Sequence, residues 1–169
     1  MTKTLARAEL LAGQQFAWSE RTPLQRAMID RAEVALAAAL QSADPAARVL
    51  REPDLLLTAQ AVVIPDLAVF CGATWSGPDL VVEYRAESTD RLFYGPKRLA
   101  YARARVAEVW FVDATKETLT ALRLTDALDY PWPATSFGPG DRVRSSSIPG
   151  LTLNVRDFWQ RGLDLHADR

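Results

Sequence analysis

The chain has 169 residues, of which 49% are apolar and 24% charged. This length and composition predict one globular domain over residues 1–169, with an N-terminal extension over 1–20 and a polar tail over 163–169. A net charge of −1 and one cysteine exclude a globally basic surface and an internal disulfide. No run reaches the roughly 20 apolar residues of a membrane span and no signal peptide is recognisable, so we expect a cytoplasmic protein without a membrane segment.

The first confident element is a helix over residues 22–41. Thr22 and Gln25 have the spacing of a capping box, and Pro23 suits the first helical turn. Apolar residues recur every three or four positions and predict a stripe that packs against a sheet. Before this helix the pattern is weak, and we expect only a helical turn over 8–12 and a short edge strand over 15–18.

Short apolar runs after the helix predict strands. The run over 49–57 contains Pro53, which places it at an edge or bulge. A turn separates it from 62–64. The runs over 67–70 and 80–84 are continuous, bounded by proline and glycine, and therefore typical of buried strands.

Two carboxylates accompany the last two of these strands. Asp66 precedes the first and Glu83 lies inside the second. A hairpin closed by residues 71–78 would place Asp66 opposite Tyr84 and next to Glu83. Directly opposed side chains of such a hairpin lie about 5 Å apart on the same face. Two acids this close favour a cation between them, and their oxygens suit Mg²⁺, with Mn²⁺ as a substitute. The alternative is that both acids lie at strand ends in water.

A lysine is the third candidate of this site. Gly95 and Pro96 signal the start of a helix over 96–105, and Lys97 shares a face with Tyr101 four residues later. Near two carboxylates, such a lysine could orient or deprotonate a water, or stabilise charge on a phosphate. A solvated helix cation is the alternative. This lysine belongs to a basic stretch over 91–105, which could follow the phosphates of a nucleic acid or be a solvated helix face. The stretch has no acid and five basic residues: Arg91, Lys97, Arg98, Arg103 and Arg105.

The segments PDLAVF, PDLVVEYRAEST and KRLAYARARVAEVWFVDA, with SSSIPGLTLNVRDFW near the end, carry a family resemblance. They resemble the "putative restriction endonuclease" family, formerly a domain of unknown function and abundant in cyanobacteria, within the PD-(D/E)XK nuclease superfamily. The resemblance implies a restriction-endonuclease-like fold and a metal-dependent phosphodiesterase in which Asp66 and Glu83 match the acidic ligands. Because Arg85 stands where the superfamily has its lysine, the resemblance assigns that role to Lys97.

The same resemblance suggests outer members of the site. It makes Glu9 and Glu20 candidates for outer carboxylates. In nuclease folds of this type a helical acid can reach the metal site, which makes Glu33 a further candidate, with a surface glutamate as the alternative. Gln25 lies near the position of the family's usual histidine, and Phe93 stands where an aspartate often precedes the second helix.

The C-terminal part predicts more strands. A strand over 108–113 pairs with 119–124 and, through a crossover, lies parallel to 80–84. Asp113 at its end is expected to cap a turn. Short strands and turns follow, and a short helix over 155–162 closes the domain.

These expectations combine into an α/β fold, with a mixed, mostly antiparallel, twisted sheet flanked by the two helices. The leading hypothesis is a Mg²⁺-dependent endonuclease acting on nucleic acid, with DNA as substrate, and a homodimer for cutting both strands. Asp66, Glu83 and Lys97 would be catalytic, Arg85 and Arg98 would contact the backbone, and Tyr101 would support the site.

The alternative is a non-catalytic module that uses the same fold to bind nucleic acid or another protein. Trp75, Trp132 and Trp159 could then form an interface. The presence of both acids and the lysine favours the enzyme, because a site without function is free to lose them.

Overall fold

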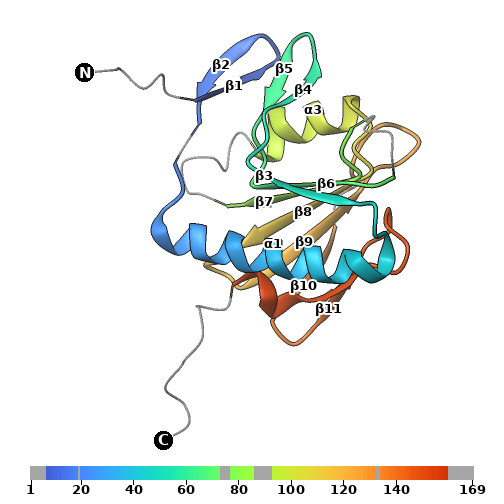
Figure 1. The fold of residues 1–169 in the computed structure, drawn as a ribbon. Coiled ribbons are helices and arrows are strands. Elements are labelled where there is room, and N and C mark those ends of the chain that lie inside the picture. The colour runs from blue at the N-terminus through green and yellow to red at the C-terminus, as the bar shows by residue number, and fades with distance from the viewer. Residues whose placement is uncertain (1–6, 19, 73–76, 86–92, 132–133, 160–169) are drawn as a thin grey trace, which may run out of the picture.

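The computed structural model describes residues 7–18, 20–72, 77–85, 93–131 and 134–159. Figure 1 shows three layers: the helix α1 on one face of a central sheet, and the helix α3 with two hairpins on the other. No helix within the described part of the chain is long and apolar enough to cross a membrane.

The central sheet has six strands in the order β10-β9-β8-β7-β6-β3. Only β7 and β8 run parallel, so the predicted mixed and mostly antiparallel sheet is confirmed. Every residue of the three middle strands is buried, because both faces of the sheet are covered. The strands are β3 (Arg48–Arg51), β6 (Leu67–Phe70), β7 (Leu80–Tyr84), β8 (Glu108–Asp113), β9 (Thr118–Arg123) and β10 (Thr135–Phe137).

A second sheet of four strands has the order β2-β1-β5-β4. The helical turn predicted over 8–12 is wrong, because alternate residues there turn inward and pair with two neighbouring strands. Ala12 and Gly13, with φ of 51° and 79°, make the two-residue hairpin loop. The strands are β1 (Ala8–Leu11), β2 (Gln14–Ala17), β4 (Leu55–Thr58) and β5 (Ala61–Val63).

The single strand predicted over 49–57 is also wrong, because it is two strands in different sheets. The chain leaves β3 at Arg51, turns at Glu52 with φ of 43°, and re-enters as β4 in the second sheet. Pro53 lies in this break, where no ladder hydrogen bond is needed from its nitrogen. A two-stranded sheet of β11 (Arg142–Arg144) and β12 (Thr152–Asn154) completes the strands described.

The first helix, α1 (Pro23–Ala43), begins as predicted. The backbone N–H of Gln25 donates to Thr22 Oγ1 at 3.2 Å, and the backbone N–H of Thr22 donates to Gln25 Oε1 at 2.9 Å. Both halves of the capping box are therefore present. The apolar stripe of this helix packs on the central sheet through Met28, Ile29, Ala32, Leu36 and Leu40.

The second helix differs from the prediction at both ends. A π-helical turn, η1 (Phe93–Lys97), precedes α3 (Arg98–Arg103), so Pro96 lies inside the helical segment. Pro96 has no N–H to donate, which removes one bond of a regular α-helix. The helix stops before Arg105, whose φ is 60°. The closing helix η2 (Val155–Phe158) is a 3₁₀ turn, and residues 160–162 of the predicted helix lie outside the described residues.

The core has two parts, one on each face of the central sheet. One lies between the sheet and α1 and includes Trp110, whose ring meets Phe158 edge-on at 5.8 Å. The other lies between the sheet, α3 and the four-stranded sheet. Trp159, predicted as an interface residue, is only 7% exposed and belongs to the first part, whereas Trp75 and Trp132 lie outside the described residues.

A buried carboxylate joins the C-terminal segment to the sheet. Glu108 Oε2 accepts hydrogen bonds from the Ser145 hydroxyl, the Ser146 backbone N–H, and both the hydroxyl and the backbone N–H of Ser147, at 2.7–3.0 Å. Its other oxygen accepts from Trp110 Nε1 at 2.7 Å. This charge is satisfied by five donors, so we assign Glu108 a structural role.

Candidate functional site

Asp66 and Glu83 face each other across neighbouring strands. The β6–β7 ladder pairs Leu67 with Val82, so its next step places Asp66 opposite Glu83, on one face of the sheet. The predicted partner, Tyr84, is one residue too far. The connection fixes this register, because Asp79 N–H donates to the carbonyl of Val69 at 2.8 Å where the second strand begins.

Lys97 lies between two carboxylates. Its Nζ is 2.6 Å from Glu83 Oε1 and 3.0 Å from Glu9 Oε1. The Tyr101 hydroxyl, one turn along the helix, donates to the same Glu83 oxygen at 2.6 Å. The backbone N–H of Ile64 donates to Glu9 at 2.8 Å, which holds that side chain in place. The π-helical turn and β1, which lie on the same face of the central sheet, therefore bring Lys97 and Glu9 to Glu83.

Asp66 binds a different cation, Arg21. Arg21 Nε donates to Asp66 Oδ1 at 2.5 Å and Nη2 donates to Oδ2 at 2.9 Å, a two-pronged ion pair. The backbone N–H of Tyr84 also donates to Oδ2 at 2.7 Å. We call Glu9, Arg21, Asp66, Glu83 and Lys97 the charge cluster, and each of them is at most 5% exposed.

Burial and mutual charge set the protonation of this cluster. Burial raises the pKa of Glu83, and the charges of Asp66 and Glu9 raise it further, while Lys97 opposes both. Burial lowers the pKa of Lys97, but Glu83 and Glu9 outweigh this and the net pKa is raised. Lys97 is therefore a cation at neutral pH. The cluster holds three acidic and two basic side chains, so acidic groups outnumber basic groups by one in a buried setting.

The tyrosine beside this charge stays protonated. Burial raises the pKa of Tyr101 well above its ordinary value, and the charge of Glu83 raises it further. Tyr101 can therefore donate a hydrogen bond to Glu83 over the whole physiological pH range.

The family is decided by the sequence profile described as "Putative restriction endonuclease", named Uma2, which matches residues 1–156. The chain belongs to the Uma2 family. The Uma2 match spans the whole charge cluster, because it includes both Glu9 and Lys97. No curated protein matches the sequence.

Solved structures support the fold of this Uma2 chain. A "putative nuclease belonging to DUF820" from Anabaena variabilis ATCC 29413 is similar with a TM-score of 0.73 and 16% identity, over 94% of this chain and 93% of that one. The restriction-endonuclease-like α/β fold is therefore confirmed. The type IIG restriction endonuclease BpuSI is similar with a TM-score of 0.46 and 12% identity, over 67% of this chain and 14% of that one.

Families with the restriction-endonuclease-like fold generally use divalent metal ions, and the charge cluster of this Uma2 chain supplies suitable atoms. Asp66 and Glu83 present carboxylate oxygens, and Glu83 Oε2 accepts no hydrogen bond from any residue that the structure describes. The residue types thus fit a hard cation. Their arrangement keeps them in ion pairs, and within the described ranges no three acidic, histidine or cysteine side chains converge as a ready metal site.

The two arginines predicted to contact nucleic acid are each paired with an acid: Asp113 ends β8, and Asp129 lies in the loop between β9 and β10. Arg85 Nη1 lies 2.5 Å from Asp113 Oδ2, and Arg98 Nη2 lies 3.3 Å from Asp129 Oδ1. Asp113 Oδ1 also accepts from the backbone N–H groups of Thr115 and Lys116, the turn cap that the sequence predicts. Arg91 lies outside the described residues.

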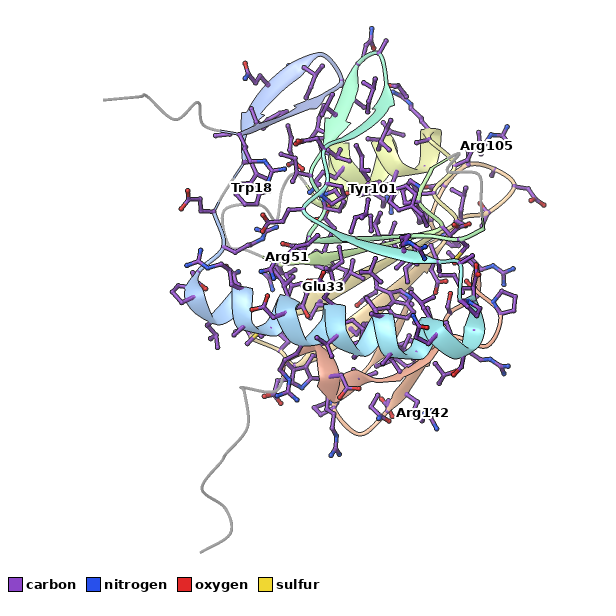
Figure 2. The ribbon with its side chains drawn as sticks, in the orientation of Figure 1. Trp18, Glu33, Arg51, Tyr101, Arg105 and Arg142 are labelled. Carbon is purple, nitrogen blue, oxygen red and sulfur yellow. The ribbon has the colours of Figure 1, made fainter. Side chains whose placement is uncertain are left out.

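The predicted outer acids have different positions. Glu9 lies inside the charge cluster, whereas Glu20 is exposed just before α1. Glu33 lies 3.8 Å from Arg51 on the opposite face of the sheet from Tyr101, as Figure 2 shows. Glu33 therefore pairs with a surface cation in this structure.

Sequence reasoning missed Arg21. It lies between β2 and the capping box of α1, and no spacing links it to Asp66, because 45 residues separate the two. The only signal is that a buried acid needs a cation, and the chain offers many arginines.

The structure has a cavity of about 820 Å³ at one end of the central sheet. It lies where β7 and β8 end and α1 begins, and Arg85, Arg156 and Thr22 contribute to its wall. Its volume lies within the range of about 300–1,000 Å³ that is usual for ligand-binding pockets.

Proposed function

We propose that the chain is a Mg²⁺-dependent endonuclease that hydrolyses phosphodiester bonds in nucleic acid, with DNA as its substrate and Mn²⁺ as a substitute ion. The observation that carries this proposal is the juxtaposition of Asp66 and Glu83 across β6 and β7, with Lys97 in contact with Glu83. Membership of the Uma2 family supports it.

Asp66 and Glu83 would hold the ion. When bound, a divalent ion lowers the pKa of a water ligand and screens the negative charge of a phosphate. Lys97 is charged, so we assign it the tasks of orienting the water and stabilising charge on the phosphate rather than accepting a proton. Tyr101 keeps Glu83 in its rotamer through the 2.6 Å hydrogen bond.

Arg85 and Arg98 would guide the nucleic-acid backbone toward this site. Both arginine side chains are 29% exposed, so they could reach a phosphate while keeping their acidic partners. The cavity beside Arg85 would receive part of the substrate. A duplex has two strands to cut, and a symmetric homodimer would supply two copies of the site.

The competing function is a non-catalytic module that binds nucleic acid or protein. One observation favours it: Asp66 is already neutralised by Arg21, as expected of a structural ion pair. A protein of this kind would keep its fold and its partner without any response to divalent ions.

Cleavage assays separate the two functions. The purified chain would be incubated with supercoiled plasmid, linear duplex, single-stranded DNA and RNA, with Mg²⁺, Mn²⁺ or EDTA. We expect ion-dependent cleavage that Asp66→Asn and Glu83→Gln reduce by about a hundredfold or more. Glu20→Gln is the matched control at an exposed acid. Undiminished cleavage by Asp66→Asn, measured on folded protein, would refute the assignment.

A further inference from the structure

Arg21 occupies both oxygens of Asp66. The two distances, 2.5 and 2.9 Å, involve two different nitrogens of one guanidinium, so the groups form a bidentate ion pair rather than a loose contact in a charged patch. Arg21 and Asp66 are 5% and 1% exposed. An ion pair shielded from water in this way is screened weakly by salt.

The surrounding chain holds Arg21 in this position. Its carbonyl accepts a hydrogen bond from Arg26 Nη1 at 2.5 Å, which ties the backbone to the first turn of α1. Its guanidinium carbon lies 5.9 Å from the centre of the Trp18 ring. The backbone N–H of Tyr84 donates to Asp66 Oδ2 at 2.7 Å, the oxygen that also accepts from Arg21 Nη2. Each partner of the ion pair is therefore also held by a hydrogen bond that involves a backbone group: the carbonyl of Arg21 for one, and the N–H of Tyr84 for Asp66.

A divalent ion and Arg21 require the same atoms. Mg²⁺ and Mn²⁺ bind carboxylate oxygens at close range, and the hydrogen bonds from Arg21 and Tyr84 already use three of the roughly four lone-pair sites of Asp66. Positive charge on both would also be unfavourable within a few ångströms in a buried site. An ion at Asp66 would therefore bind more tightly if the Arg21 contact were weakened or displaced.

We propose that Arg21 is an internal counter-ion that competes with the divalent ion for Asp66. This inference rests on the proposed function, because it takes Asp66 as an ion ligand. Arg21 holds the carboxylate in place in the ion-free protein and sets the ion concentration at which the site fills. The Trp18 ring, whose centre lies 5.9 Å from the guanidinium carbon, gives Arg21 a favourable contact besides Asp66.

The test is a titration of the full chain with Mn²⁺, followed by thermal melting. An ion that binds only the folded state raises the melting temperature with its concentration, so the midpoint of this rise reports affinity. We expect Arg21→Gln to lower the midpoint by at least about tenfold, the scale on which groups contacting a metal ligand change affinity. Arg21→Lys keeps the positive charge but loses the bidentate contact with Asp66, so its midpoint should lie between those of the wild type and Arg21→Gln.

Arg7→Gln is the matched control. Arg7 also lies over the Trp18 ring, at 5.0 Å, but pairs with Glu52 and Asp54 rather than with Asp66. Its midpoint should equal that of the wild type. The double variant Arg21→Gln, Asp66→Asn should lose the gain in affinity, which shows that the effect passes through Asp66.

A midpoint in Arg21→Gln equal to or higher than that of the wild type would overturn the inference, while leaving the ion-dependent nuclease intact. Absence of any response in all proteins, Arg21→Gln included, would defeat both proposals. A response in Arg21→Gln but not in the wild type would support the inference in its strongest form.

A measurement on the wild type covers the case in which the Arg21 variants do not fold. The Arg21 Nε–H and the Tyr84 backbone N–H both donate hydrogen bonds to the Asp66 carboxylate. Their signals in ¹⁵N spectra can be followed during a Mg²⁺ titration. We expect both to shift together. If the Tyr84 amide shifts while Arg21 Nε–H does not, the ion binds without displacing Arg21 and the inference is wrong.

Discussion

Asp66 and Glu83 lie opposite each other on one face of the central sheet, yet each is bound to a different cation of the chain, Arg21 and Lys97. The structure thus separates two like charges by giving each its own partner. The cluster still contains one more acidic than basic side chain, and that imbalance makes its response to substitution predictable.

Glu83→Gln should make the protein more stable at neutral pH. Burial raises the pKa of Glu83, so the charged carboxylate is less favourable in the folded than in the unfolded chain. Below the unfolded pKa near 4.5, wild type and variant should unfold at the same urea concentration; as pH rises through the raised pKa, the wild type loses stability and the variant does not. Urea midpoints measured from pH 4 to pH 8 test this.

An amide suits this position. The side-chain nitrogen introduced by Glu83→Gln can replace Oε2, which accepts no hydrogen bond from the part of the chain that the structure describes, while the amide oxygen keeps Tyr101 and Lys97. Glu20→Gln, at an exposed position, should follow the wild type at every pH. A variant at Glu83 that is less stable than the wild type at pH 8 would contradict the prediction.

Lys97→Met should destabilise the fold by about 3–5 kcal/mol, the cost of leaving a buried partner charge uncompensated. Here two carboxylates, Glu9 and Glu83, lose their common cation. Denaturant unfolding measures the loss, with Lys116→Met at an exposed turn as control. Adding Glu83→Gln to Lys97→Met should restore part of the stability, and a double variant no more stable than the single would refute this account.

Tyr101→Phe and Tyr130→Phe form a matched pair. Both hydroxyl groups are buried, but Tyr101 donates to the Glu83 carboxylate at 2.6 Å and Tyr130 to the carbonyl of Val106 at 2.7 Å. Loss of a hydrogen bond to a charged group costs about 1.5–3 kcal/mol and loss of a neutral one about 0.5–1.5 kcal/mol. Unfolding in urea should therefore rank Tyr101→Phe as the more damaging. Equal losses would mean that Glu83 is protonated.

Cys71 should react slowly with alkylating reagents. Burial raises the pKa of its thiol to about 12, with further increases from the charges of Asp79 and Asp44. At pH 8 only about one molecule in 10⁴ would be a thiolate, against roughly a quarter for an ordinary cysteine. Iodoacetamide labelling followed by mass spectrometry measures the rate. Asp79→Asn should accelerate labelling, and a rate equal to that of free cysteine would contradict the prediction.

The sequence predicts the main helix and the buried strands of this fold better than the breaks and pairings between segments. The Thr22 capping box and the continuous apolar strands depend on local residue choice, and both are confirmed. The break at Pro53 and the strand nature of β1 depend on pairing with distant segments, which local pattern does not encode.

The same distinction holds for the candidate site. Asp66, Glu83 and Lys97 stand out because polar groups interrupt apolar runs or begin a helix, and the structure brings the last two into contact. Arg21 has no such signal, because its role exists only once the chain has folded across 45 residues. The predicted hairpin register differs from the observed one by one residue, because the exact pairing is set by the hydrogen bonds of Asp79 at the turn.

The contact from Ile64 N–H to Glu9, and from Glu9 through Lys97 to Glu83, crosses from the four-stranded sheet to the six-stranded one. A two-stranded hairpin is marginal alone in water, and β2 is largely exposed. The residues proposed for catalysis therefore also fasten the N-terminal hairpin to the body of the protein. Amide hydrogen exchange in β1 becomes a readout of that site, so damage to the chemistry and loosening of the β1–β2 hairpin should appear together.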